Sequence, residues 1–287
     1  MMSRTTLGVA LSLMAGVCLS TGGIALRLVE SADGFQILFY RALTFVVLMA
    51  VVILATYRAR TWSAILAVGW PGLLVATVLG LGAIFYVMSI LHTTVANAVV
   101  ILSTSPLLTA LLAWLVLGVR ASASTLIASM VAIFGVSLMV LDGLSTGGLI
   151  GMAIAFAAGA CYAVMLVTMQ QVRGRDLMPA TGLSGLVTLI IAWIAAPDLV
   201  VGLHDIGIGV FLGSVQFGLG FILITIAARY IDGALVALLT LVEVVLAPFW
   251  VFLGVGEAPT QLALVGGAVV LVAVFAQAVY ALRKPSS

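Results

Sequence analysis

Ten apolar runs follow one another along the chain, and each is long enough to cross a lipid bilayer as a helix. Such a helix needs about 20 apolar residues, because every backbone polar group in the hydrocarbon must be bonded within the segment. Of the 287 residues, 64% are hydrophobic and only 7% are charged, whereas soluble domains carry about 25% charged residues. The sequence therefore predicts an all-α integral membrane protein with spans at 7–28, 34–56, 71–91, 95–117, 123–141, 149–171, 181–197, 208–228, 234–254 and 262–282.

The composition also limits the classes of function. A net charge of +2 without any basic run does not suit nucleic-acid binding. The chain has no CxxC pair and no phosphate-cradling glycine loop, and its two cysteines imply no disulfide framework. Its two histidines, His92 and His204, lie far apart and do not suggest a metal site. We therefore expect no metal, no cofactor and no nucleic-acid partner.

The basic residues test the number of spans, because cytoplasmic loops retain Lys and Arg. With ten spans and a cytoplasmic N-terminus, nine basic residues fall on the inner side, Arg27 falls on the outer side, and Arg41 lies within the second span. We therefore predict a multi-pass protein of a bacterial-type inner (plasma) membrane with both termini in the cytoplasm. The nine inner residues are Arg4, Arg58, Arg60, Arg120, Arg173, Arg175, Arg229, Arg283 and Lys284.

Internal similarity divides the chain into two halves, 1–143 and 144–287. AGVC at 15–18 matches AGAC at 158–161, and GLG at 80–82 matches GLG at 218–220. Each half holds five spans, so the two copies enter the membrane from opposite sides. This is the pattern of an inverted repeat, which places a substrate site near the bilayer midplane. The first apolar run has an internal copy in the sixth span, so we expect it to be a helix and not a cleaved signal peptide.

A second pair of matching segments carries a family resemblance. LSTSPLLTALLAWLVLGV at 102–119 and TLVEVVLAPFWVFLGVGE at 240–257 resemble the recurrent phrase of the drug/metabolite transporter superfamily, in particular its ten-helix exporters built from two EamA-type repeats. Within that superfamily the chain is most similar to the YddG-like exporters of aromatic and other amino acids. Val119 and Val244 depart from the family pattern, and Pro248 follows Val244 by four residues. The second helix kink is therefore expected near Pro248.

The resemblance implies a secondary transporter that exports small organic solutes, most of all amino acids, by alternating access around a central cavity. The protein would be a monomer in the lipid bilayer and not an enzyme. Three alternatives stay open: an exporter of other metabolites or drug-like cations, a membrane-embedded lipid-modifying enzyme, and a passive channel.

Two charged residues inside spans are candidates for the site. Glu243 aligns with Ser105 in the repeat and lies near the predicted bilayer centre. An isolated charge there costs about 2.5–3.5 kcal/mol on insertion scales. Glu243 should therefore pair with Arg41, face a cavity, or contact substrate or a proton. Arg41 either packs near the outer interface or turns its guanidinium into the cavity, where it would attract a carboxylate.

Polar and aromatic side chains supply the remaining candidates. Pro106 lacks a backbone N–H and frees a carbonyl about one turn earlier, where neighbouring hydroxyls compete for it. Each of these residues has an ordinary packing role as its alternative. The further cavity candidates are Ser103, Thr104, Ser105, Tyr86, Asn97, Tyr162, Gln216, Phe217 and Trp114.

Overall fold

The computed structural model describes residues 4–92, 98, 101–139, 141, 149–256 and 260–283. Within these ranges the chain is helical and contains no strand. Eight helices are long and apolar enough to cross a membrane, and two shorter apolar helices, Ser105–Leu117 and Ala123–Met139, complete the series. The predicted ten-helix membrane fold is confirmed.

The helices follow the order of the predicted spans. The first half contains α1 (Arg4–Ser20), α2 (Gly22–Arg27), α3 (Gly34–Tyr57), η1 (Arg58–Arg60), α4 (Thr61–Leu66), α5 (Gly69–His92), α7 (Ser105–Leu117) and α8 (Ala123–Met139). The second half contains α9 (Leu149–Gln171), α10 (Met178–Ala195), α11 (Leu203–Phe211), η3 (Leu212–Leu219), α12 (Gly220–Ala227), α13 (Gly233–Thr240), α14 (Val242–Val255) and α15 (Gln261–Arg283).

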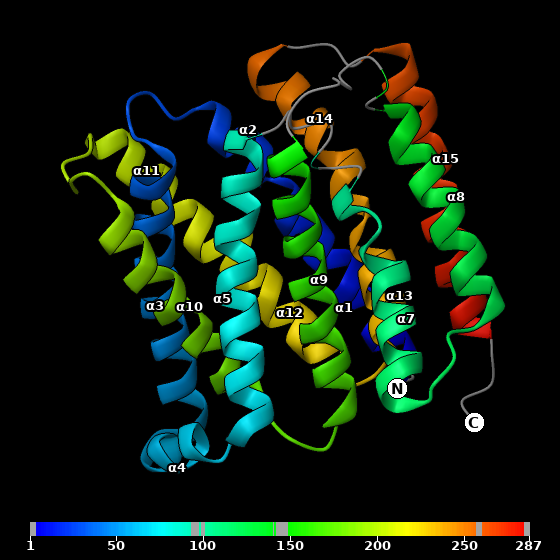
Figure 1. Cartoon of the computed structure of the whole chain (residues 1–287), viewed down its shortest axis with the longest axis horizontal. Coiled ribbons are helices and arrows are strands. Elements are labelled where there is room, and N and C mark those ends of the chain that lie inside the picture. Colours follow the sequence, from blue (N-terminus) through cyan, green and yellow to red (C-terminus); the bar gives the residue numbers. More distant parts are fainter. Residues whose placement is uncertain are drawn as a thin grey trace.

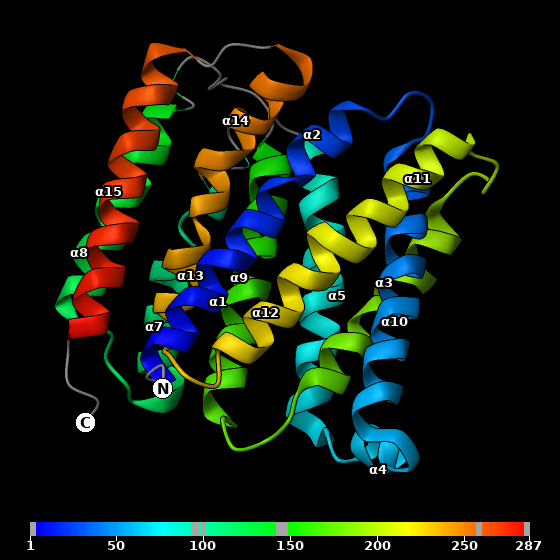
Figure 2. The same cartoon turned by 180° about the vertical axis from the view of Figure 1, so that it is seen from behind.

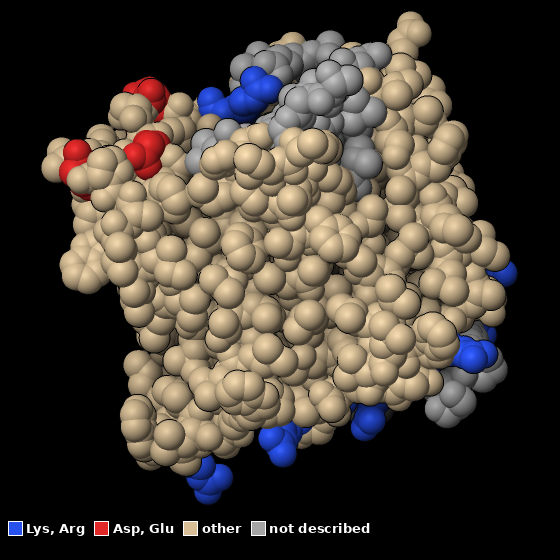
Figure 3. Space-filling model, viewed as in Figure 1, with Lys and Arg blue, Asp and Glu red and all other residues tan. Residues whose placement is uncertain are grey.

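The helices run across the molecule from one end to the other (Figures 1 and 2). We call one end the α4 end, because α4 lies there, and the opposite one the α11 end. Helix α1 begins and α15 ends at the α4 end. On the face shown in Figure 3, Lys and Arg lie along the α4 end and in one patch at the α11 end, where the visible Asp and Glu gather. Basic residues thus favour the α4 end, where Arg173 and Arg229 also pair with Asp232 and Asp176.

The packing of the helices repeats when the two halves are exchanged. Three contacts join a helix to its own counterpart, and three further contacts between the two halves occur in equivalent pairs. The self-equivalent contacts are α3 with α10, α7 with α13, and α8 with α15. The contact of α5 with α9 corresponds to that of α12 with α1. The contact of α7 with α9 corresponds to that of α14 with α1, and the contact of α5 with α10 corresponds to that of α11 with α3.

The fourth and ninth spans are interrupted at equivalent places. In the fourth, Thr104 N donates to Ile101 O at 3.0 Å, and Leu107 N donates to Thr104 O at 3.0 Å. In the ninth, Leu241, one residue before the counterpart of Thr104, has the same pair of hydrogen bonds: its N donates to Leu238 O at 3.1 Å, and Val244 N donates to its carbonyl at 3.0 Å. Both restarted helices end at a left-handed glycine, Gly118 and Gly256.

The interruption of the ninth span does not lie at Pro248, near which a kink is expected. Pro248 lies inside α14, whereas the helix is interrupted at Leu241. In the fourth span the proline, Pro106, stands in the first turn of α7, where a missing N–H leaves no hydrogen bond unmade. The two spans are thus interrupted at closely matching positions, whereas their prolines lie at different distances from the interruption.

The eighth span contains a π-helix, Leu212–Leu219, between α11 and α12. It crosses α3 at very short distance, since a Cβ atom on Gly213 would lie 2.2 Å from the carbonyl oxygen of Arg41. Such wide turns are rare and occur often at functional sites. Here the wide turn carries Gln216 and Phe217 past α3.

Candidate functional site

A cavity of about 220 Å³ lies between α2, α3, α5 and the π-helix. Its walls are mostly aliphatic, and three polar side chains from different spans reach it: Arg41, Tyr86 and Gln216. Asp33 and Gly34, at the start of α3, line its outer part. Arg41 follows Asp33 by two helical turns, which is about 12 Å along the axis. The cavity therefore extends from the α11 end into the apolar region.

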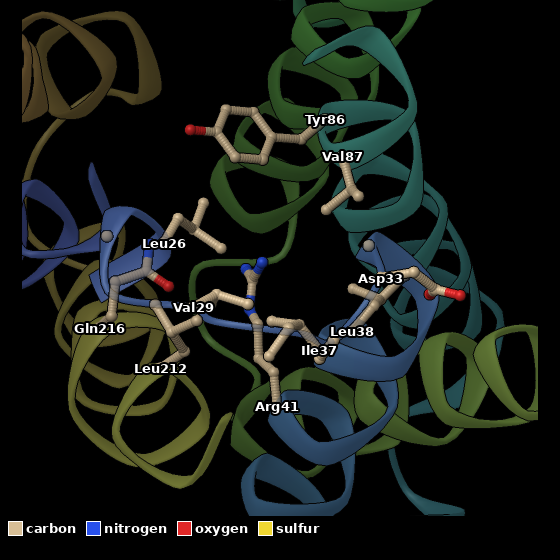
Figure 4. A pocket seen from close by; sticks show the side chains of 13 residues that line it. Leu26, Val29, Asp33, Ile37, Leu38, Arg41, Tyr86, Val87, Leu212 and Gln216 are labelled. Atoms are coloured by element: carbon tan, nitrogen blue, oxygen red, sulfur yellow. The ribbon is translucent and has the colours of Figure 1, made fainter. Parts of the chain in front are cut away.

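Arg41 is 8% exposed, and its guanidinium points into this cavity, opposite Tyr86 and Val87 (Figure 4). The guanidinium carbon lies 4.3 Å from the centroid of the Phe217 ring, a distance at which cation and ring attract each other. Within the described part of the chain, Arg41 has neither an acidic partner nor a side-chain hydrogen bond. Of its two predicted orientations, the structure has the one that faces the cavity.

Gln216 comes from the π-helix and reaches the same cavity (Figure 4). Its amide nitrogen lies 3.5 Å from the carbonyl oxygen of Leu19, a long hydrogen bond. Its Oε1 atom is buried and has no hydrogen-bond partner among the described residues. A buried acceptor left unmade costs about 1–3 kcal/mol. Because Oε1 has almost no accessible surface, Gln216 lines the cavity with other atoms.

Aromatic rings connect the cavity to the interrupted ninth span. Phe217 lies 4.3 Å from Phe221, and Phe221 lies 6.4 Å from Tyr162, in each case between ring centroids. The Tyr162 hydroxyl lies 3.4 Å from the hydroxyl of Thr240, the last residue of α13. The predicted candidates Phe217 and Tyr162 thus belong to one row of rings.

Glu243 stands in the first turn of α14, directly after the interruption. It is half-buried, and in the described residues its carboxylate has no hydrogen bond and no ion pair. The expected pair between Glu243 and Arg41 is therefore not formed. Instead, Tyr86 lies within electrostatic range of both charges, and Tyr162 lies within range of Glu243.

The predicted candidates of the fourth span lie at its interruption or directly beside it. Thr104 donates its hydroxyl hydrogen to Ile101 O at 2.6 Å. Ser103 and Ser105 are buried, with exposures of 1% and 5%, as is Pro106. None of the four lines the cavity. The Thr104 side chain therefore bonds within its own helical turn.

Two predicted candidates are not part of this arrangement. Trp114 is 47% exposed on the surface of the bundle, and Arg120 lies 5.8 Å from its ring centroid. It cannot form a wall of the cavity, because α7 turns this residue outward. Asn97 lies outside the described residues.

The sequence did not point to Asp205, which reads as an ordinary loop acid at the start of the eighth span. Its side chain is buried and accepts hydrogen bonds from the backbone N–H groups of Glu30, Ser31 and Ala32, each at 2.9 Å. It also accepts one from the Ser31 hydroxyl at 3.0 Å. Asp205 thereby holds the connection between α2 and α3, part of which lines the cavity.

A second polar cluster joins the halves at the α4 end. Asp176 accepts hydrogen bonds from the Tyr57 hydroxyl, from Arg229, and from Met178 N at 3.0 Å. Partial burial opposes ionisation of this carboxyl, but the three donors and the positive charge of Arg229 together lower its pKa below the ordinary value. The structure thus has hydrogen bonds between the halves at both ends of the helices.

Comparison with known proteins agrees with the fold. Residues 6–141 match the EamA-like transporter family. A solved structure titled "Crystal structure of protein" has a TM-score of 0.81 and 18% sequence identity, and the match covers 97% of this chain and 99% of the other. No curated protein matches the sequence. Residues 6–141 are therefore similar to the EamA-like transporter family, and the solved structure shares the fold of nearly the whole chain.

Proposed function

We propose that this protein is a secondary transporter that exports amino acids across a bacterial-type inner membrane. The observation that carries the proposal is the separation of two charges without counterions among the described residues. Arg41 faces the cavity, Glu243 stands in the first turn of α14, and neither forms an ion pair among the described residues. Each isolated charge is costly in a membrane. A zwitterionic solute would supply the opposite charge to either or both.

The size and charge of the cavity favour a small metabolite over a drug-like cation. Pockets for drug-sized ligands measure about 300–1,000 Å³, whereas this cavity measures about 220 Å³. Arg41 repels a cation that has no anionic group. An amino acid meets both requirements.

Alternating access would be carried by the inverted halves 1–143 and 144–287. In support, polar bonds join the halves at both ends: Asp205 to the connection after α2, and Tyr57 to Asp176. If the route opens to one side at a time, the hydrogen bonds at one end must break while those at the other end remain. Export is proposed from the family resemblance, because orientation does not determine the direction of flux.

Uptake of labelled amino acids into liposomes that contain the purified protein tests this function. The expected result is saturable uptake that unlabelled substrate competes away. Uptake that stays linear with concentration would indicate a passive channel. No competable uptake of aliphatic, aromatic or polar amino acids would contradict the assignment.

The proposed orientation has its own test. Single cysteines at Glu30 and at Arg58, in a chain whose Cys18 and Cys161 are replaced by alanine, are exposed to a membrane-impermeant maleimide in intact cells. Both positions are exposed at opposite ends of α3. Labelling of the Glu30 position alone is expected for cytoplasmic termini. Labelling of the Arg58 position alone would reverse the orientation.

A further inference from the structure

Three exposed arginines surround the connection between α3 and α5. Arg58 and Arg60 form η1, directly before α4. Arg175, from the second half of the chain, lies beside the start of α5, since a Cβ atom on Gly69 would lie 3.5 Å from its Nη1 atom. Within the described part of the chain, none of these three arginines forms an ion pair.

The described carboxylates of this end are already bonded to other residues. Asp176, next to Arg175 in the sequence, accepts hydrogen bonds from Tyr57 and Arg229. Asp232 pairs with Arg173. The positive charge around α4 therefore remains for a partner from outside the chain.

The backbone of Arg58 gives independent evidence for such a partner. Among the described residues, Arg58 alone combines a side chain with a positive φ, and its φ and ψ are 50° and −123°. Glycine adopts this conformation readily, whereas a residue with a side chain is held in it at a cost. The exposed Arg58 side chain makes no ion pair in the described chain that would offset the cost.

An exposed apolar surface adjoins the arginines. Trp62, Leu66 and Trp70 are 70%, 64% and 76% exposed, and Leu66 follows Trp62 by four residues, so both lie on one face of α4. Because α4 directly joins two spans and lies at the corner of the bundle beyond the end of α3 (Figures 1 and 2), this surface is at the boundary between bilayer and water. Tryptophan is enriched at that depth.

We propose that the α4 connection binds an anionic phospholipid, with its phosphate on Arg58, Arg60 and Arg175 and its acyl chains against the surface of Trp62, Leu66 and Trp70. Guanidinium groups bind phosphate oxygens with paired hydrogen bonds. Near an anionic membrane surface, each arginine changes the affinity about fivefold. The proposal does not depend on which solute the protein carries.

Tryptophan quenching in bilayers tests the site. A chain with Trp114, Trp193 and Trp250 replaced by phenylalanine keeps only Trp62 and Trp70 as reporters. It is placed in phosphatidylcholine bilayers with a small fraction of either phosphatidylglycerol or phosphatidylcholine that is brominated near the headgroup end of its chains. Brominated phosphatidylglycerol should quench with at least about fivefold higher affinity. Equal quenching by the two lipids would overturn the proposal.

Charge variants show whether the preference is local. Arg58→Gln with Arg60→Gln should lower the preference for phosphatidylglycerol at least about fivefold. Arg120→Gln with Arg283→Gln is the matched control, because it removes the same charge next to α8 and α15, on the opposite side of the bundle from α4 (Figures 1 and 2). An equal loss in this control would mean that net charge attracts the lipid, which contradicts a site at α4.

Arg58→Gly separates the backbone cost from the binding of lipid. In phosphatidylcholine the variant should melt at the same temperature as the wild type or higher, because glycine tolerates the positive φ. Its preference for phosphatidylglycerol should nevertheless fall. A lower melting temperature would show that the Arg58 side chain stabilises the fold, against the proposal.

A soluble headgroup analogue distinguishes a lipid from a free phosphate. An excess of sn-glycerol 3-phosphate, which has the phosphate but no acyl chains, should leave the quenching by brominated phosphatidylglycerol unchanged. Full competition by this compound would identify a site for soluble phosphates and overturn the assignment to a lipid.

Discussion

The guanidinium of Arg41 lies 4.3 Å from the ring centroid of Phe217, and the two residues come from opposite halves of the chain. Among the described residues no carboxylate pairs with Arg41, and its guanidinium lies over the Phe217 ring instead. The same ring packs edge-on against Phe45 at 4.9 Å. Phe217 therefore holds Arg41 in place without neutralising it, which leaves the charge available to a ligand.

The strength of this contact can be measured directly. Phe217→Leu keeps an apolar side chain but removes the ring, and Arg41→Met removes the charge. A double-mutant cycle on the free energy of unfolding should give a coupling of about 0.5–2 kcal/mol. Phe45→Leu in place of Phe217→Leu serves as the control and should couple weakly to Arg41→Met. A coupling near zero for Phe217 would show that the contact contributes nothing.

Glu243→Gln tests whether the carboxylate is structural or functional. No ion pair with Arg41 is formed, so the variant should fold and melt close to the wild type and should need no compensating Arg41 change. Transport in liposomes should fall at least about tenfold, since an interaction with a charged group worth about 1.5–3 kcal/mol is lost. Glu30→Gln, at the exposed α11 end, is the control. A large loss of stability that Arg41→Gln restores would instead support an ion pair.

The Gly213 crossing predicts a sharp contrast between two glycines of the eighth span. Gly213→Ala places a Cβ atom 2.2 Å from the Arg41 carbonyl oxygen and should cost about 1–3 kcal/mol of stability. Gly207→Ala meets no atom within 4 Å and should be neutral or stabilising by up to about 1 kcal/mol. Thermal melting in detergent compares them. Equal effects at both positions would contradict the close crossing.

The hydrogen bonds of Asp205 should restrain the connection between α2 and α3, which lines the outer part of the cavity. Asp205→Asn weakens the hydrogen bonds to residues 30–32, so the connection after α2 should move more freely. A cysteine at Val29, which lines the cavity, should then react faster with a maleimide in a chain without Cys18 and Cys161. Glu30→Gln provides the background rate. An unchanged rate would mean that these bonds do not restrain the connection.

Asp176 predicts an acid-dependent part of the stability. Its pKa is lowered in the folded state, so this contribution is present above the unfolded pKa of about 4 and is lost as the pH falls through the folded pKa. The ion pair with Arg229 is partly exposed, at 33% and 42%, and should contribute no more than about 1 kcal/mol. Asp176→Asn should flatten the fall in melting temperature at acidic pH. If the variant shows the wild-type fall, other carboxyl groups cause it.

The sequence by itself predicted that the protein lies in a lipid bilayer, how many spans it has and that its two halves repeat. These features depend on local quantities, since a run of about 20 apolar residues must become a helix in lipid whatever its neighbours are. The charge pattern of the loops predicts which end of the helices faces the cytoplasm. The family phrase at 102–119 and 240–257 lies on the two spans that are interrupted, and the interruption of the ninth span at Leu241 lies seven residues before Pro248.

The tertiary structure alone decided which polar residues meet. Arg41 and Gln216 are separated by 175 residues in the sequence, and they share a cavity because Gly213 lets the eighth span cross α3 at backbone distance. The π-helix, the outward turn of Trp114 and the hold of Asp205 on residues 30–32 likewise arise from contacts between distant segments. Apolar spacing specifies that a helix forms and inserts, but in a membrane it does not specify which face meets a neighbour. That choice depends on close packing and on the pairing of the few polar groups.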